Sequence, residues 1–164
     1  MILDIKKWPE QVLRTRCQEW DFNNPPAGLN RFLSTDLLET LHHYQAHGIA
    51  ANQVGVSYRV IAININRSLG TTLMFNPEIV SISEDQYKNS EGCLSFPNVF
   101  LDITRPKTVD ARWQDINGVY HTETLEDMDA KCFLHELDHL NGIVFKEYVS
   151  DLKFNMAVKK GKKR

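Results

Sequence analysis

The sequence predicts an α+β fold in which mostly antiparallel strands pack around one central helix. Three features of the chain indicate this fold. Residues 59–65 (RVIAINI) are rich in β-branched side chains, as strands are. An Asn-Gly pair at 117–118 separates two segments of alternating apolar and polar residues, which is a strong hairpin signal. Residues 127–141 carry apolar side chains at helical spacing, and we expect this helix to lie at the centre of the strands.

The first half of the chain contains weaker local signals. Residues 8–14 begin extended and run into a short helical turn. Residues 21–28, which include two asparagines and two prolines, form a loop. Apolar residues recur every three or four positions over 29–46, which predicts an amphipathic helix. A capping signal near residue 34 is an alternative start for that helix.

The second half supplies the remaining elements. Residues 74–82 form another β-branched run and predict a second strand. The arms of the predicted hairpin are residues 108–115 and 119–125. Gly142 stands where the central helix should end, and a last short helix begins near residue 150. We expect no second domain, because the chain shows no internal repeat and no break in composition.

The composition fits one folded, globular chain. With 164 residues, 42% hydrophobic and 24% charged, it excludes collagen-like, low-complexity and wholly disordered proteins. The 19 basic and 21 acidic residues give a net charge of -2, so no overall field draws the molecule to nucleic acid or to an anionic membrane. We therefore expect a small or mixed-charge partner, with no membrane and no sequence-specific nucleic acid.

The cysteines and the N-terminus predict a cytoplasmic protein. Cys17, Cys93 and Cys132 are too few and too scattered for a disulfide framework, which fits a reducing compartment. The first eight residues lack the apolar region of an export signal, and no stretch approaches 18 consecutive apolar residues. We therefore expect neither export nor a membrane span.

The strongest motif is H-E-L-D-H at residues 135–139, inside the predicted central helix. His135 and His139 are one helical turn apart, about 6 Å along the axis, so both imidazoles can reach one metal ion. Glu136 lies beside them and suits a general acid or base acting on a metal-bound water. An amphipathic helix whose histidines make ordinary hydrogen bonds remains an alternative for this motif alone.

A catalytic metal site of this kind needs a third protein ligand. The downstream positions do not supply one, because Phe145 stands where one protease pattern has a histidine and Glu147 comes too soon for the other. This disfavours a zinc peptidase. Cys132 lies about 10 Å of helix rise from His139, too far to share its metal, so we expect Cys132 to pack beside the site.

Two further segments have the small residues of a binding site. Cys93 follows Gly92, which permits close backbone approach, although a buried structural cysteine would read the same way. No second cysteine or histidine stands at a paired spacing around Cys93, which disfavours a closed, non-catalytic metal module. Residues 48–55 (GIAANQVG) offer the Gln53 amide as a donor but lack the glycine pattern of a phosphate-binding loop.

Together these three segments resemble peptide deformylase. The family's motifs occur in order as G-I-A-A-N-Q at 48–53, E-G-C-L-S at 91–95 and H-E-L-D-H at 135–139. The resemblance covers nearly the whole chain, and flanking residues also agree: Pro9 to Arg14, Arg105-Pro106, Ala130, Cys132, Leu140 and Gly142. It identifies the predicted central helix as a metal-binding helix.

The resemblance implies a mononuclear metal held by Cys93, His135 and His139, with water as the fourth ligand. The family's usual metal is Fe(II), and zinc, nickel or cobalt can occupy the site. The implied substrate is the N-formyl-methionyl end of a newly made polypeptide, which is hydrolysed to formate and a free amine.

The resemblance also implies roles for other residues. Glu136 takes the proton of the attacking water and protonates the leaving amine. The Gln53 amide and the backbone N–H of Leu94 hold the oxyanion. Backbone groups near Gly48 and Gly92 pair with the extended substrate as an added strand. We group Cys132 with these substrate-binding residues because it packs beside the site.

Three positions depart from the family's pattern. His47 stands where the first motif has an apolar residue, and could reshape the methionine pocket or simply face solvent. Phe100 stands where many bacterial members have arginine, and Leu134 where a glutamine is common. None of the three is a predicted metal ligand.

The C-terminal end is basic, with five Lys or Arg among residues 159–164. We expect a single catalytic domain over residues 1–158, followed by a disordered tail over 159–164. Such a tail could contact ribosomal RNA where formylated chains emerge, or be a frayed, solvated end.

Overall fold

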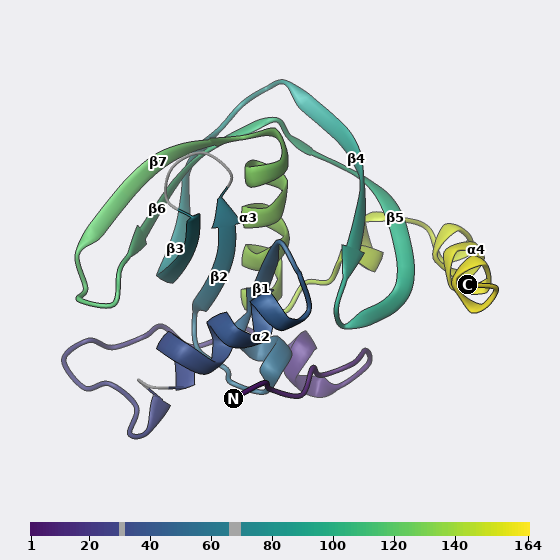
Figure 1. Ribbon diagram of the computed structural model, residues 1–164. Coiled ribbons are helices and arrows are strands. Elements are labelled where there is room, and N and C mark those ends of the chain that lie inside the picture. The colour runs from purple at the N-terminus through teal and green to yellow at the C-terminus, as the bar shows by residue number, and fades with distance from the viewer. Residues whose placement is uncertain (30–31, 66–69) are drawn as a thin grey trace.

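The computed structural model describes residues 1–29, 32–65 and 70–164. A five-stranded antiparallel sheet, ordered β1-β2-β3-β6-β7, forms one side of the molecule (Figure 1). Its strands are β1 (Gly48–Ala50), β2 (Val60–Ile65), β3 (Gly70–Ile82), β6 (Thr108–Gln114) and β7 (Tyr120–Glu126). The two predicted β-branched runs and the predicted hairpin are confirmed in this sheet. The short strand β1 lies at one edge and leads directly into the helical turn that carries Gln53.

A second, two-stranded sheet was not predicted from the sequence. It consists of β4 (Gln86–Cys93) and β5 (Phe96–Pro106), paired antiparallel. The register of the two strands is regular from Gln86, which pairs with Pro106, to Gly92, which pairs with Phe100. It then shifts between Gly92 and Cys93. This irregularity gives the end of β4 a geometry that differs from the rest of the strand, at the residue predicted to bind metal.

Helix α3 (Asp127–Leu140) stands between the two sheets (Figure 1). It contacts β1, β2, β6 and β7 on one side and β5 on the other. Its buried Phe133, Leu137 and Leu140 belong to an apolar cluster that includes residues of β2, β3, β6 and β7. The predicted α+β architecture around a central helix is confirmed, and the helix carries the H-E-L-D-H motif with all of its residues except Asp138 buried.

The N-terminal part of the chain consists of short helical segments and loops. It contains η1 (Gln11–Arg14), a π-helical turn η2 (Phe32–Asp36), α2 (Leu37–His43) and η3 (Ala51–Val54). The predicted turn after residue 8 is confirmed. The amphipathic helix predicted over 29–46 is observed from Phe32 to His43, while its positions 30 and 31 lie outside the described residues. It ends early because Gln45 has a positive φ of 50°, which no α-helix accommodates.

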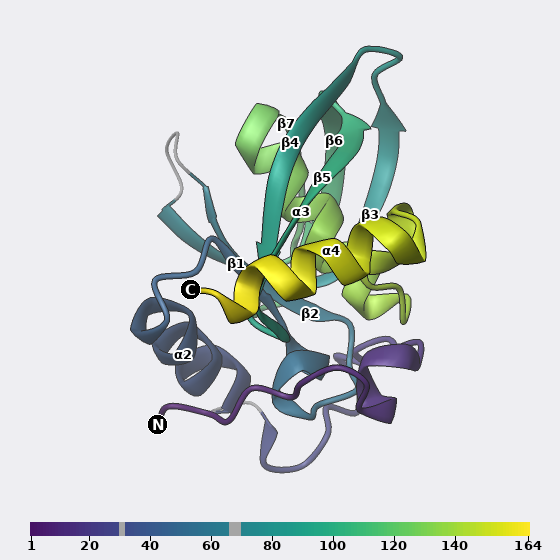
Figure 2. The same ribbon diagram turned by 90° about the vertical axis from the view of Figure 1, so that its right-hand side faces the viewer.

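The C-terminal part lies on the outside of β5. After η4 (Phe145–Tyr148), α4 (Asp151–Lys162) begins where the Ser150 hydroxyl accepts the Lys153 N–H at 3.2 Å, an ordinary N-cap. Figure 2 shows α4 crossing in front of the two-stranded sheet. Apolar side chains of α4 pack against β5 and η4: Phe154, Ala157 and Val158.

The predicted disorder of residues 159–164 was wrong for most of that segment. Helix α4 continues to Lys162, so most of the predicted disordered tail is helical. The reason is a close contact between Gly161, which is buried, and the backbone of Asn98: a Cβ on Gly161 would lie 2.3 Å from the Asn98 carbonyl oxygen. Only glycine permits this approach, so the contact ties the end of the basic segment to strand β5. Of the helices in the described residues, none is both long enough and apolar enough to cross a membrane.

Candidate metal centre

The structure brings Cys93, His135 and His139 together. Their ligand atoms all lie within 4.8 Å of one another, and Cys93 Sγ is 3.3 Å from His139 Nε2. Bonds of 2.0–2.3 Å in a tetrahedral site separate neighbouring ligand atoms by about 3.3–3.8 Å. The three side chains are therefore spaced to hold one metal ion after only small adjustments. In the described part of the chain this is the one cluster of its kind.

Two separate elements supply the ligands. Both histidines project from one face of α3, as the four-residue spacing predicts, with ring centroids 5.1 Å apart. Cys93 comes from the irregular end of β4, which the two-stranded sheet carries up to the helix. The Gln53 amide Nε2 lies 3.5 Å from Cys93 Sγ and donates to Ser95 Oγ at 3.2 Å, so η3 closes the third side.

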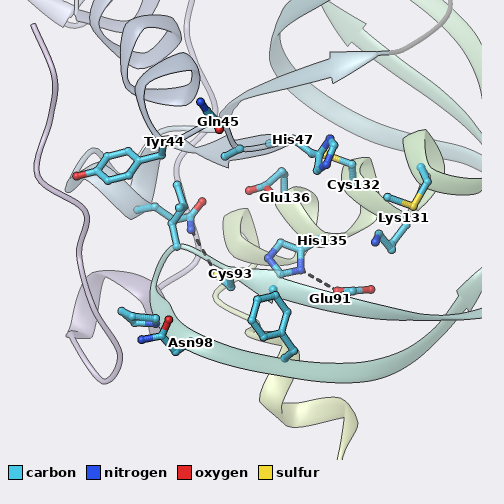
Figure 3. A pocket seen from close by; sticks show the side chains of 18 of the residues that line it. Tyr44, Gln45, His47, Glu91, Cys93, Asn98, Lys131, Cys132, His135 and Glu136 are labelled. Carbon is cyan, nitrogen blue, oxygen red and sulfur yellow. Dashed lines mark hydrogen bonds and ion pairs between the residues drawn. The ribbon is translucent and has the colours of Figure 1, made fainter. Parts of the chain in front are cut away.

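Hydrogen bonds leave the correct nitrogen of His135 available. Its Nδ1 bonds Glu91 Oε1 at 2.8 Å, drawn as a dashed line in Figure 3, so Nε2 faces the cluster. Glu91 is in turn held by Arg105, whose Nη2 donates to Oε1 at 3.0 Å. Arg105 Nη1 also donates to Asp138 Oδ2 at 2.9 Å. A carboxylate behind a histidine ligand orients the ring and raises its basicity, which is the usual support of a metal site.

The protonation states follow from this network. Burial raises the pKa of Glu91, but hydrogen bonds from His135 and Arg105 outweigh it and bring the pKa to about 2. Burial lowers the pKa of His139 well below its ordinary range, so its imidazole is neutral, the form that binds metal. Burial also lowers the pKa of His135, but its bonds to Cys93 and Glu91 raise it overall; metal binding would then release that proton.

The donor set therefore fits a divalent metal. It offers one thiol and two imidazoles, all converging, in a site where a carboxylate fixes His135. The Nδ1 atom of His139 is buried, and among the described residues it has no hydrogen-bond partner, so Nε2 is the atom directed to the cluster. Cys132 does not belong to the cluster, as its distance along the helix predicts.

Glu136 is buried beside the cluster with a free oxygen. It is 4% exposed, and its Oε2 has no hydrogen-bond partner among the described residues. Burial raises the pKa of Glu136 to about 7. The space for this side chain depends on Gly48, because a Cβ there would lie 2.7 Å from both Glu136 Oε1 and Cys132 Sγ. The carboxyl group can thus exchange a proton near neutral pH at a point that faces the pocket.

A cavity of about 570 Å³ opens over the cluster (Figure 3). Eight of the nine sequence-predicted site residues line it: Gly48, Gln53, Gly92, Cys93, Leu94, Cys132, His135 and Glu136. His139 lies beneath, 1% exposed. Sequence reasoning gave no role to Arg105 or Asp138. It also did not predict that Glu91 supports His135. Arg105 and Glu91 stood in segments that resembled the family, and that was the available signal.

The three departures fall in different places. His47 lines the cavity with an exposed side chain, in line with the solvent-facing alternative (Figure 3). Phe100 also lines the cavity and is 51% exposed. Leu134 is 7% exposed, belongs to the apolar cluster under the large sheet, and is not among the residues that line the cavity.

Comparisons with known proteins agree with this geometry. A family model described as polypeptide deformylase matches residues 2–155. A peptide deformylase of Wolbachia sp. subsp. Brugia malayi is 35% identical, over 98% of this chain and 94% of the relative. One from Zymomonas mobilis is 36% identical, over 97% and 92%.

Solved structures show the same fold. The crystal structure of peptide deformylase from Ehrlichia chaffeensis has a TM-score of 0.88 at 34% identity, covering 99% of this chain and 96% of that one. The structure of the Acinetobacter baumannii enzyme, described as bound to Met-Ala-Ser, has a TM-score of 0.84 at 28% identity, covering 91% and 99%.

Proposed function

The chain belongs to the peptide deformylase family, and from that premise we propose the roles that its own residues take in the reaction. The activity is a metal-dependent hydrolysis that removes the N-formyl group from newly made polypeptides. The observation that carries the proposal is the placement of the buried Glu136 carboxyl in the same cavity as the Cys93, His135 and His139 cluster. We prefer this function to the two alternatives, a zinc peptidase and a non-catalytic metal-binding module.

Cys93 Sγ, His135 Nε2 and His139 Nε2 would hold the metal ion. When bound, the ion polarises the formyl carbonyl and lowers the pKa of a coordinated water. We propose Fe(II) as the metal in the cell, with zinc, nickel or cobalt able to replace it. One soft thiolate and two imidazoles accept all of these ions, and thiolate ligation makes the centre sensitive to oxidation at the sulfur.

Glu136 moves the proton. Its free Oε2 accepts a proton from the attacking water, and the same carboxyl then donates it to the nitrogen of the leaving amine as the C–N bond of the formamide breaks. Burial supports both halves of this role, because a carboxyl with a pKa raised to about 7 both accepts and gives up a proton near neutral pH. Formate and a free methionyl amine are the products.

Gln53 and Leu94 stabilise the oxyanion. The Gln53 Oε1 accepts the Ala50 N–H at 2.9 Å, which fixes the amide so that its NH₂ group points toward Cys93. Leu94 lines the same cavity at the turn between β4 and β5, and we assign its backbone N–H as the second donor. Oriented donors of this kind contribute roughly 3 kcal/mol each to transition-state stabilisation in other hydrolases.

The substrate binds as an extended chain between two strands. Gly48 in β1 and Gly92 in β4 both line the cavity, and β1 is an edge strand of its sheet. Main-chain pairing of this type accepts many side chains after the methionine. Cys132 packs under Gly48 and forms part of the cavity wall. The Met-Ala-Ser complex of the Acinetobacter enzyme supports a methionyl peptide as the ligand here.

Formate release tests the proposal. The protein is reconstituted anaerobically with Fe(II) and compared with zinc-loaded and metal-free samples on a short N-formyl-methionyl peptide. We expect metal-dependent formate release that is faster with Fe(II). One bound metal per chain without any formate would contradict the assigned roles.

We also propose that the basic end of α4 contacts the ribosome in the cytoplasm, where formylated chains are made. The side chains of Lys159, Lys160, Lys162 and Lys163 are exposed along the last turn, while Gly161 stays packed on Asn98. A variant with all four lysines changed to glutamine keeps the Gly161 contact. Its affinity for ribosomes, measured over a salt series, should fall and lose salt dependence. Unchanged affinity would contradict this contact.

A further inference from the structure

Two lysines stand at the cavity with their charges facing neutral groups. Lys7, from the N-terminal segment, donates from Nζ to the Leu94 carbonyl at 2.7 Å. Lys131, near the start of α3, donates from Nζ to the Ser90 carbonyl at 3.1 Å. Figure 3 shows Lys131 beside Cys132 at the end of the cavity away from Asn98. A carbonyl oxygen satisfies a donor but does not cancel its charge, so both ammonium groups remain attractive to an anion.

A third cation, Arg164, lies two residues beyond the end of α4 and contacts Phe100 at the same rim. The Arg164 guanidinium carbon lies 5.0 Å from the centroid of the Phe100 ring, within the range of a cation–π contact. Phe100 lines the cavity and is half exposed. The position of Arg164 follows from the close packing of Gly161 on Asn98, which brings the end of the helix to this edge.

Acidic side chains contribute little to the described lining of the cavity. Among the described residues, the carboxyl groups that line it are those of Glu91 and Glu136, both buried in its floor. Glu91 is bound by Arg105 and His135, so its charge is compensated locally. The rim therefore has an excess of positive charge although the whole chain has a net charge of -2. Charge of one sign around a concave site attracts the opposite charge on a ligand.

We propose that Lys7, Lys131 and Arg164 give this enzyme a preference for formyl-methionyl peptides with acidic side chains in the residues that follow methionine. The inference rests on the proposed function, because it assumes that the peptide runs past Gly92. Gly92 pairs with Phe100 across the two-stranded sheet, so a chain along β4 passes close to the ring that holds Arg164. At about 3.3 Å per residue, the second to fourth residues fall within roughly 10 Å of the methionine.

Three peptides test this preference. They are formyl-Met-Ala-Xaa-Ser with Glu, Gln or Lys at the variable position, and kcat/KM is measured by formate release with the metal-loaded enzyme. We expect the Glu peptide to be hydrolysed fastest and the Lys peptide slowest. The ratio between the Glu and Gln peptides should approach one as the salt concentration rises, because exposed charges are screened. Binding of the deformylated peptides, measured by calorimetry, should show the same order.

Variants locate the effect. Arg164→Gln and Lys131→Gln should each lower the Glu-to-Gln ratio about twofold to fivefold, the range expected for one exposed ion pair. Lys153→Gln removes an equal charge from the exposed start of α4 and should leave the ratio unchanged. Hydrolysis of the Gln peptide with no preference for Glu, or an equal effect of Lys153→Gln, would overturn the inference. Failure to hydrolyse even the Gln peptide would instead contradict the proposed function.

Discussion

The two sides of α3 are built differently. Toward the five-stranded sheet the helix presents apolar side chains, among them Phe133 and Leu137, which pack with Val109 and Leu125 of the hairpin. Toward the two-stranded sheet it presents His135 and Asp138, which contact Glu91 and Arg105 through hydrogen bonds and ion pairs. One side thus holds the helix in place, and the other sets the orientation and charge of its metal ligands.

The free energies of apolar burial and of ion pairing explain why the two sides of α3 differ. Burial of apolar surface stabilises a fold by about 25 cal/mol per Å², whereas a buried ion pair is on average no more stabilising than apolar residues of the same size, although losing the charge of one partner is costly. The charged side is therefore retained for what it does to His135, since a hydrogen-bonded carboxylate fixes the ring and its tautomer. One face of the helix is thus built for apolar packing, and the opposite face is built for tuning the metal ligands.

The largest expected effect is catalytic and lies within the cavity. Glu136→Gln keeps the size of the side chain but cannot accept a proton, so turnover should fall about 10²–10⁴-fold. Metal content, measured by mass spectrometry of the purified protein, should stay at one ion per chain. Metal loss in this variant would make Glu136 a ligand or a structural support of the centre.

On the apolar side, Phe133→Ala should reduce the free energy of unfolding by about 3–5 kcal/mol. Phe133 is fully buried in the cluster under the large sheet, so its removal leaves a cavity. Urea unfolding of the metal-free protein measures the loss, with Leu152→Ala on the exposed face of α4 as the matched control. A loss below 1 kcal/mol would contradict the role of this face.

On the charged side, the free energy of unfolding should depend on pH. The pKa of Glu91 is about 2 in the fold and 4.5 when unperturbed, so its contribution is fully present above pH 4.5 and is lost as the pH falls toward 2. The shift corresponds to about 3 kcal/mol. Unfolding of metal-free protein over this pH window should show the loss, and Glu91→Gln should flatten the curve. An equally steep curve in that variant would assign the acid sensitivity to other groups.

A smaller effect should appear in metal affinity. Glu91→Gln retains an oxygen that can accept from His135 Nδ1 but removes the charge, and we expect affinity for zinc to fall about 10–100-fold. Glu78→Gln, in the exposed pair with Arg112, is the matched control and should not change it. Competition with a chromophoric chelator measures both. Equal affinities in the two variants would show that Glu91 does not tune the centre.

Strong local signals explain which parts of the fold the sequence predicted. The Asn-Gly turn, the run 59–65 and the helical spacing of 127–141 each determine an element within a short window, and all three elements are observed. Strands β4 and β5 form a hairpin, but β4 carries mostly polar side chains and the turn between the strands, Leu94-Ser95, lacks the Asn-Gly or Asp-Gly signal, so both strands were missed. The helical end of α4 was missed because it depends on the contact of Gly161 with Asn98, which is distant in the sequence.

The site shows the same limit. The spacing of the helix motif selected His135, His139 and Glu136, the family resemblance added Cys93, and the structure places these residues together. It gave no role to Arg105 and Asp138, because their ion pair joins β5 to α3 across 33 positions of sequence. Charges that act through a neighbour are visible only once the two elements are packed side by side.

X-ray absorption at the metal edge is the most direct test of the central claim, that Cys93 completes a centre with the two histidines of α3. The account predicts one sulfur at about 2.3 Å and two imidazole nitrogens at about 2.0–2.1 Å in the zinc-loaded protein. Cys93→Ser should remove the sulfur shell, while Cys132→Ser should leave it unchanged. A spectrum without sulfur, or one that loses its sulfur in Cys132→Ser, would contradict the account.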